Sequence, residues 1–120
     1  MDLTRAVVEA WLERYVRAWD SNDPADITAL FTDDARYFTA PHRDPWVGPD
    51  TIAAKWIRRK DEPGTWTFRS EILGVDGDLA FVRGWTTYMN DPDYSNLWVI
   101  RLDGNGKCSE FTEWWMEVDK

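Results

Sequence analysis

The chain has 120 residues, a formal net charge of −8 and nine Trp, and 15% of its residues are aromatic. This length is typical of a single domain, which we expect to span residues 1–120. The negative charge argues against nucleic acids and anionic membrane surfaces as partners.

Other classes of protein are disfavoured by what the sequence lacks. No apolar run has the length of a membrane span, and the N-terminus has no basic and apolar signal region. The single Cys108 cannot form an internal disulfide, and no His/Cys cluster has the spacing of a zinc site. We therefore expect a cytoplasmic protein that needs no cofactor.

The first half of the chain predicts three helices and one strand. Apolar residues at helical spacing over residues 3–19 predict a long amphipathic helix. Asp23, followed by a proline, predicts the N-cap of a short second helix whose buried face includes Phe31. A strand is expected over residues 35–40, and a third helix over residues 49–60.

The second half predicts four antiparallel strands, over residues 66–75, 79–89, 96–102 and 110–117. The first two flank the dipeptide Asp76-Gly77, which is a strong signal for a two-residue hairpin turn. Helices gathered on one face of such a sheet make an α+β fold, and a strongly curved sheet encloses an apolar interior.

The hairpin turn determines which side chains face that interior. With Asp76 and Gly77 as the two turn residues, Ser70 lies opposite Arg83 and Phe68 lies opposite Trp85. Arg83 and Trp85 then share the apolar inner face of the sheet.

The last strand places a carboxylate on the same inner face. Side chains alternate across a strand, so Phe111, Glu113 and Trp115 lie on one side. A carboxylate between two large aromatic rings is either paired or has its pKa raised. The two inward charges predict a buried Arg83–Glu113 ion pair.

The opposite face of the sheet should be partly apolar. Its expected apolar residues are Leu73, Val82, Leu97, Val99, Trp114 and Met116. Exposed apolar area of this kind is typical of an interface, so we expect a symmetric homodimer through the outer face.

Four segments resemble nuclear transport factor 2-like (NTF2-like) domains of the SnoaL-like kind. These are residues 13–19, residues 23–35, residues 46–52 and residues 103–117. The resemblance covers essentially the whole chain. It implies a cystatin-like cone, in which a strongly curved, mixed but mostly antiparallel sheet wraps around the N-terminal helices, and it also suggests a homodimer.

Two enzyme families of this fold are distantly similar to the chain. In the comparison with ketosteroid isomerase, Tyr15 corresponds to the tyrosine that donates to the oxyanion. The general-base aspartate of that family corresponds to Thr39, and its protonated carboxylic acid corresponds to Trp98. Both carboxyl groups are therefore replaced here.

In the comparison with limonene-epoxide hydrolase, Tyr37 corresponds to a tyrosine that helps to hold the attacking water. Arg83 corresponds to the arginine of the catalytic triad, and Glu113 to its water-activating aspartate. The second triad aspartate, which protonates the epoxide oxygen in that family, corresponds to Trp85 and is therefore replaced here. The water-holding asparagine of that family corresponds to Thr39.

Together these observations predict a buried aromatic pocket for a small, largely apolar organic molecule. Its expected lining residues are Tyr15, Trp19, Thr39, Trp56, Phe68, Trp85, Trp98, Phe111 and Trp115. We expect the mouth of the pocket near the loop that contains His42 and Trp46.

Three interpretations of the pocket remain open. In the first, the protein is an isomerase, cyclase or hydrolase in which Glu113 is the general base, oriented by Arg83 and holding a water with Tyr37. In the second, Arg83–Glu113 is a structural ion pair in a non-catalytic ligand-binding or dimeric assembly domain. In the third, Arg83 anchors an anionic ligand.

Overall fold

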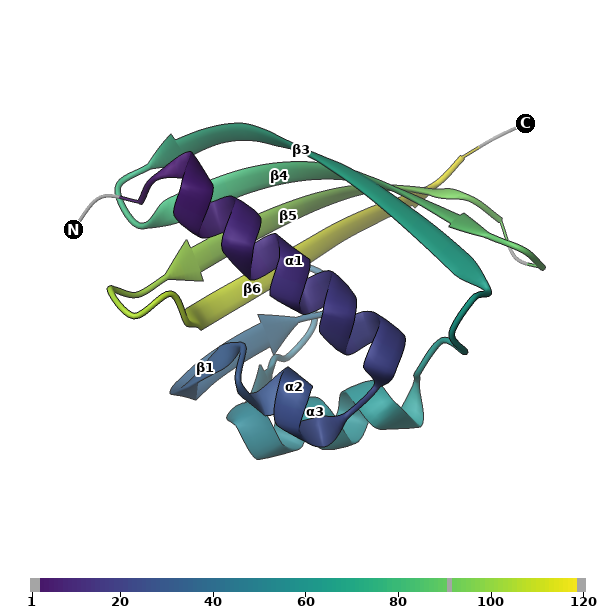
Figure 1. Cartoon of the computed structure of the whole chain (residues 1–120), viewed down its shortest axis with the longest axis horizontal. Helices are drawn as coiled ribbons and strands as arrows, with labels where there is room; N and C mark the ends of the chain where they lie inside the picture. Colours follow the sequence, from purple (N-terminus) through teal and green to yellow (C-terminus); the bar gives the residue numbers. More distant parts are fainter. Residues whose placement is uncertain (1–2, 91, 119–120) are drawn as a thin grey trace.

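The computed structural model describes residues 3–90 and 92–118. Within them the chain forms α1 (Arg5–Ser21), α2 (Pro24–Thr28), β1 (Phe31–Phe38), β2 (Trp46–Val47), α3 (Pro49–Arg58), β3 (Trp66–Asp76), β4 (Leu79–Tyr88), β5 (Tyr94–Leu102) and β6 (Cys108–Glu117). The strands form one sheet in the order β2-β1-β6-β5-β4-β3 (Figure 1).

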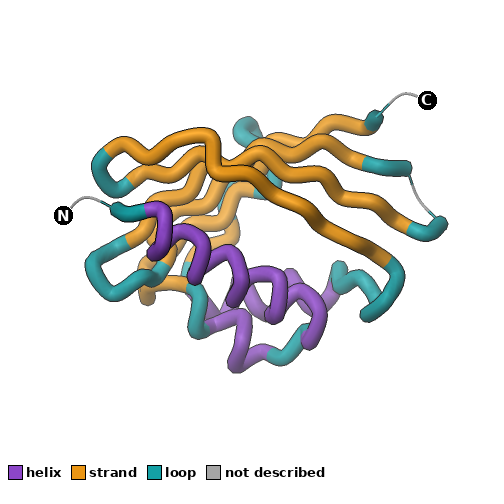
Figure 2. The backbone as a smooth tube through the Cα atoms, turned by 45° about the horizontal axis from the view of Figure 1, so that its top comes forward, coloured by secondary structure: helices purple, strands orange, loops and turns teal. Residues whose placement is uncertain are grey.

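The sheet is mixed but mostly antiparallel, because only β1 and β6 run parallel to each other. The strands curve over the three helices, which lie on one side of the sheet (Figure 2). This architecture confirms the expected α+β class and the cystatin-like cone. None of the helices in the described residues is long and apolar enough to cross a membrane.

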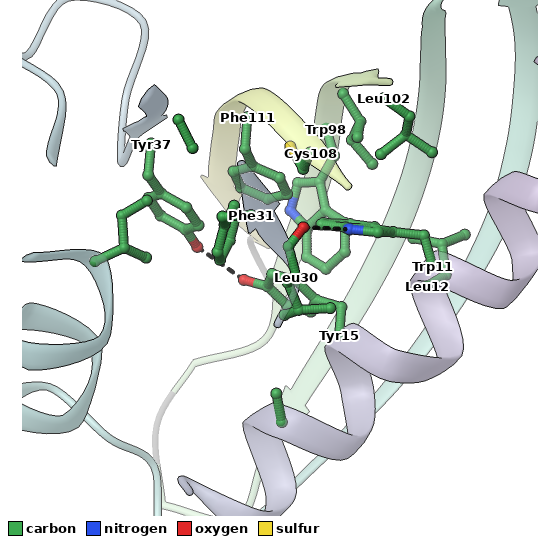
Figure 3. Close-up of a cluster of buried hydrophobic side chains, with 14 of the residues drawn as sticks. Trp11, Leu12, Tyr15, Leu30, Phe31, Tyr37, Trp98, Leu102, Cys108 and Phe111 are labelled. Atoms are coloured by element: carbon green, nitrogen blue, oxygen red, sulfur yellow. Dashed lines mark hydrogen bonds between the residues drawn. The ribbon is translucent and has the colours of Figure 1, made fainter. Parts of the chain in front are cut away.

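The core lies between α1 and the inner face of the sheet, and aromatic rings fill much of it (Figure 3). Trp11, Phe31, Trp98 and Phe111 are among the largest fully buried side chains. The indole Nε1 of Trp11 donates to the carbonyl of Leu30 at 3.1 Å, so this buried ring keeps a hydrogen-bond partner.

The helix boundaries follow from local capping. Thr4 accepts a hydrogen bond from the backbone N–H of Val7, and Asn22 ends α1 in the left-handed conformation. Asp23 caps α2 as predicted, with its side chain accepting from the N–H of Ala25. Phe31 was expected on the second helix, but it is the first residue of β1. It pairs with Cys108 of β6, and this pairing extends the strand toward α2.

The hairpin of β3 and β4 differs from the expected register by one residue. Asp76 pairs with Leu79, so Gly77 and Asp78 form the turn, and Val75 pairs with Ala80 instead of Asp78. An irregularity between Ile72 and Gly74 reduces this difference, so that beyond it the pairing differs from the expected one by a single residue. Asp78 is held in the turn by β5, since its side chain accepts from Nη1 of Arg101 at 2.5 Å. Ser70 therefore pairs with Gly84 rather than with Arg83.

A shift of one residue turns every side chain of β4 to the opposite face. Val82, expected outside, is fully buried, whereas Arg83 and Trp85 face outward. Nη2 of Arg83 donates to Oε2 of Glu71 at 3.0 Å, and the Arg83 side chain is 51% exposed. The predicted Arg83–Glu113 ion pair is therefore wrong.

Trp85 also has a role on the outer face instead of in the pocket. The guanidinium carbons of Arg69 and Arg83 lie 4.2 Å and 5.0 Å from its ring centroid. Two cation–π contacts thus cover part of the ring that the sequence placed inside.

Gly84 faces the interior in this register and leaves space for an aromatic ring. A Cβ atom added to Gly84 would lie 2.5 Å from Cε1 of Phe68. The Phe68 ring has little freedom to move, because it stacks on Trp98 at 4.8 Å and also contacts Trp19 at 5.4 Å.

We predict that Gly84→Ala lowers the free energy of unfolding by about 1–3 kcal/mol, since the new methyl group overpacks this stack. Urea unfolding followed by far-UV circular dichroism measures the change. Gly74→Ala is the matched control, because a Cβ atom at Gly74 meets nothing within 4 Å. Equal stabilities of the two variants would contradict the observed register.

Candidate functional site

A cavity of about 530 Å³ lies between the helices and the curved sheet. Its walls combine aromatic rings with a few polar groups. The lining residues are Tyr15, Trp19, Tyr37, Thr39, Arg43, Trp46, Trp56, Arg59, Lys60, Asp61, Thr86, Tyr88, Tyr94, Asn96, Trp98, Glu113 and Trp115. The volume is in the range of pockets that bind small organic molecules.

Glu113 lies on the sheet wall and is held by hydrogen bonds from β5. Its Oε2 accepts from Nε1 of Trp98 at 2.7 Å and from Nδ2 of Asn96 at 2.9 Å. The amide of Asn96 is oriented in turn, because its Oδ1 accepts from the hydroxyl of Thr86 at 2.8 Å. Trp98 lies directly opposite Glu113 in the ladder, and Asn96 is two residues away on the same inner face.

Burial raises the pKa of Glu113 above its ordinary value of 4.5, and the hydrogen bonds from Trp98 and Asn96 oppose this shift without cancelling it. No Lys, Arg or His among residues 3–90 and 92–118 lies within salt-bridge distance of this carboxylate. Glu113 is thus a partly buried acid held by neutral donors, which differs from the ion pair expected from the sequence.

Two tyrosines form a second polar group in the cavity. The hydroxyls of Tyr15 and Tyr37 are 2.7 Å apart and point toward each other (Figure 3). Both rings stack on Phe111, with centroid distances of 5.5 Å and 4.6 Å. One hydroxyl donates to the other, so the pair keeps one proton that an acceptor in the cavity can share.

The tyrosine pair is electrostatically coupled to Glu113. Burial raises the pKa of Tyr15 and of Tyr37, and the nearby charge of Glu113 raises both further. The phenols therefore stay neutral at physiological pH and act as hydrogen-bond donors rather than as bases.

Other polar residues of the lining are partly or largely exposed to solvent and form its rim. The carboxylate of Asp61 accepts from Nε1 of Trp19 at 2.9 Å and from the hydroxyl of Tyr88 at 3.3 Å. Arg43, Arg59 and Lys60 are exposed residues of the same lining.

The structure brings together Glu113 and Tyr37 but leaves Arg83 outside the cavity. Of the nine expected lining residues, those found on the wall are Tyr15, Trp19, Thr39, Trp56, Trp98 and Trp115. Phe111 and Phe68 pack behind the wall, and Trp85 faces outward. Trp46, expected near the mouth, is a lining residue, whereas His42, expected there too, is an exposed residue outside the lining.

Sequence reasoning missed the polar partners Asn96, Thr86 and Asp61. Asn96 could have been found, because it alternates with Trp98, which was already expected to face inward. Thr86 depended on the hairpin register, which the sequence placed one residue away. Asp61 lies in the loop after α3. Outside helices and strands, sequence periodicity does not indicate which way a side chain points. No group of three or more acidic, His or Cys residues within the described ranges could hold a metal ion.

Comparison with protein families supports the fold. A family model described as the SnoaL-like domain matches residues 12–115. The comparison with curated proteins gave no significant match.

Solved structures show the same fold at low sequence identity. An NTF-2 like protein of unknown function from Burkholderia xenovorans LB400 aligns with a TM-score of 0.76 and 17% identity, over 97% of this chain and 88% of its own. A ketosteroid isomerase-like protein from Erwinia carotovora atroseptica SCRI1043 aligns with a TM-score of 0.65 and 22% identity, over 94% of this chain and 96% of its own. An LEH-like epoxide hydrolase from M. tuberculosis aligns with a TM-score of 0.62 and 17% identity, over 89% of this chain and 80% of its own.

We predict that Glu113→Gln leaves stability equal to or above that of the wild type at about pH 7, because the amide oxygen still accepts from Trp98 and Asn96 while the partly buried charge is removed. A carboxyl whose folded-state pKa is raised stabilises the fold when protonated. The wild type therefore loses free energy of unfolding, relative to the Gln variant, as pH rises from 4.5 toward the raised pKa, and the difference is constant above it.

Urea unfolding at about pH 4 and about pH 7 measures this difference. Glu113→Leu serves as the control, since it removes the acceptor from two buried donors and should cost about 1–3 kcal/mol for each. A Gln variant that is clearly less stable than the wild type at neutral pH would show that the fold favours the ionised form.

Proposed function

The chain belongs to the SnoaL-like domain family, and we propose that it is an enzyme that uses Glu113 as a general base on a small, largely apolar organic molecule. The proposal rests on the surroundings of the Glu113 carboxylate. It lines an aromatic cavity, has no counter-cation among the described residues, and is oriented through Oε2 by two fixed N–H donors. Its Oε1 makes no hydrogen bond within the same residues.

Such a carboxylate suits proton abstraction for two reasons. Burial raises its pKa, which strengthens it as a base, and the hydrogen bonds from Trp98 and Asn96 oppose that rise by stabilising the ionised form. Fixed donors also hold one oxygen, so that the other is presented in a defined direction.

The tyrosine pair supplies the complementary group. When Glu113 removes a proton from a carbon next to a carbonyl, the C–H electrons form a carbon–carbon double bond and the carbonyl oxygen becomes an enolate oxygen. The free proton of the Tyr15–Tyr37 pair would then be donated in a hydrogen bond to that oxygen. In a substrate with a β,γ double bond the charge extends to the γ-carbon, and return of the proton from Glu113 to that carbon moves the double bond into conjugation and completes an isomerisation.

The aromatic walls favour an apolar substrate body. Trp19, Trp56, Trp98 and Trp115 contribute large flat surfaces, which are complementary to rings and other planar groups. Hydrolysis through a water activated by Glu113 is a related possibility in the same class of general-base chemistry. An isomerase or cyclase is favoured because the neutral tyrosine pair is suited to a forming oxyanion.

The alternative function is non-catalytic binding of the same kind of molecule. It is favoured by the scarcity of acids in the cavity, because Asp61 is the only other carboxylate of the described lining and already accepts two hydrogen bonds. In that case the network of Thr86, Asn96 and Glu113 would serve to orient a ligand.

We predict that the protein catalyses exchange of α-protons of small cyclic and aryl ketones in D₂O, measured by NMR. Glu113→Gln should slow the exchange by about 10²-fold or more, because the base is lost. The rate should rise with pH through the raised pKa of Glu113 and level off above it, since only the ionised carboxylate accepts a proton.

Tyr37→Phe is the matched second variant, and we expect a smaller loss of rate with little change in ketone binding. Some ketones could raise the melting temperatures of the wild type and of Glu113→Gln equally, while neither protein catalyses exchange of their α-protons. That result would support the binding function and overturn the catalytic one.

We also propose that the protein forms a homodimer through the outer face of the sheet. Trp114 and Met116 are 50% and 71% exposed on β6, Leu97 and Val99 lie beside them on β5, and Leu73 is exposed on β3. Val82 is excluded from this surface, because it faces the core.

Sedimentation equilibrium at micromolar concentration should give a dimer, and Trp114→Glu should give a monomer, since a charge cannot be buried cheaply in an apolar interface. Ala54→Glu is the control, because this exposed residue lies on α3, which packs on the opposite side of the sheet. A monomeric wild type would exclude the dimer.

A further inference from the structure

We propose that the ligand of the cavity is an amphiphile with an anionic oxygen head group, such as a carboxylate or sulfonate, that binds Arg43, Arg59 and Lys60 while its apolar body extends toward Glu113. The proposal rests on the proposed function, because it uses the same cavity. Its evidence is the distribution of charge around the mouth.

Positive charge is scarce in this chain but gathers at the cavity. The sequence has 14 Lys and Arg against 22 Asp and Glu. The described lining nevertheless contains three cations and two acids, Asp61 and Glu113. The lining therefore carries more cationic than anionic side chains, although the chain as a whole is negative, and this local excess favours anions over cations.

The three cations have no ionic partners within residues 3–90 and 92–118. The ion pairs of these residues use Arg36, Arg83 and Arg101 instead. Asp61 lies next to Lys60 in the chain, but its carboxylate accepts from Trp19 and Tyr88. Both of these neutral donors bind Oδ2, so the charge of Asp61 remains in the rim without a cationic partner among the described residues.

The cations also approach the mouth from different elements. Arg43 lies in the loop between β1 and β2, whereas Arg59 and Lys60 follow the end of α3. The guanidinium carbon of Arg59 lies 5.5 Å from the centroid of the Trp46 ring, which itself stacks on Tyr37 at 5.1 Å. This contact places a cation beside the aromatic wall, where a head group would leave the apolar part of the cavity.

A simpler explanation accounts for part of the cluster. Basic residues at a helix C-terminus interact favourably with the helix dipole, and Arg58, Arg59 and Lys60 all occupy that place. This explanation does not apply to Arg43, which belongs to no helix. Arg58 is exposed at the same helix end but is not a lining residue, so it distinguishes the two explanations.

The test compares two probes that share one aromatic skeleton. 8-Anilinonaphthalene-1-sulfonate carries an anionic group, and N-phenyl-1-naphthylamine is its neutral counterpart. We expect the anionic probe to bind more tightly to the folded protein, with an affinity that falls as NaCl is raised, while the affinity of the neutral probe changes little. Isothermal titration calorimetry and probe fluorescence measure both.

Arg43→Gln, Arg59→Gln and Lys60→Gln should each weaken the anionic probe about three- to tenfold and leave the neutral probe unchanged. The triple variant should bind the two probes almost equally. Arg58→Gln is the matched control and should change neither affinity. A loss with Arg58→Gln as large as with Arg59→Gln would overturn the proposal, because it would indicate a general charge effect.

Two further results separate this inference from the proposed function. If both probes bind with equal affinity and compete with a ketone, the anionic head group is excluded while the general-base function stands. If neither probe nor any ketone binds, both proposals fail. Sodium sulfate at matched ionic strength should displace no more anionic probe than NaCl does, and stronger displacement would identify a simple anion site instead of an amphiphile site.

Discussion

The indole of Trp98 connects the apolar core of this protein to its polar cavity. Its ring contacts Tyr15 at 4.7 Å, Phe68 at 4.8 Å and Phe111 at 5.1 Å. Its N–H donates to Glu113 on the neighbouring strand. A rigid aromatic cluster thus fixes a hydrogen-bond donor, and the donor fixes the carboxylate. Close packing makes this position precise, because buried side chains have few alternative rotamers.

Neutral donors make Glu113 different from a paired carboxylate. An ion pair would lower its pKa and satisfy its charge, whereas N–H donors hold it without supplying a counter-charge. The cations of the lining lie at the mouth instead, where solvent reduces the cost of leaving them unpaired. The cavity therefore has a weakly acidic inner group and a cationic rim, and this polarity is the basis for the proposed orientation of a ligand.

The sequence by itself determined the fold class and much of the inner surface. Helical periodicity, the cap at Asp23 and the alternating strands were sufficient for the order of elements, since these signals depend on neighbouring residues. The faces of β5 and β6 were also predictable, because aromatic residues such as Trp98 and Phe111 alternate with polar ones. Glu113 was placed inward for the same reason.

Only the tertiary structure decided the partners of Glu113. The dipeptide Asp76-Gly77 predicted one turn, but contacts of Asp78 with β5 and an irregularity in β3 moved the pairing by one residue. That shift moved Arg83 out and brought Thr86 in, because strand side chains alternate with a period of two. Register depends on contacts between distant segments. Local sequence therefore determined which carboxylate faces inward, and the fold determined which side chains hold it.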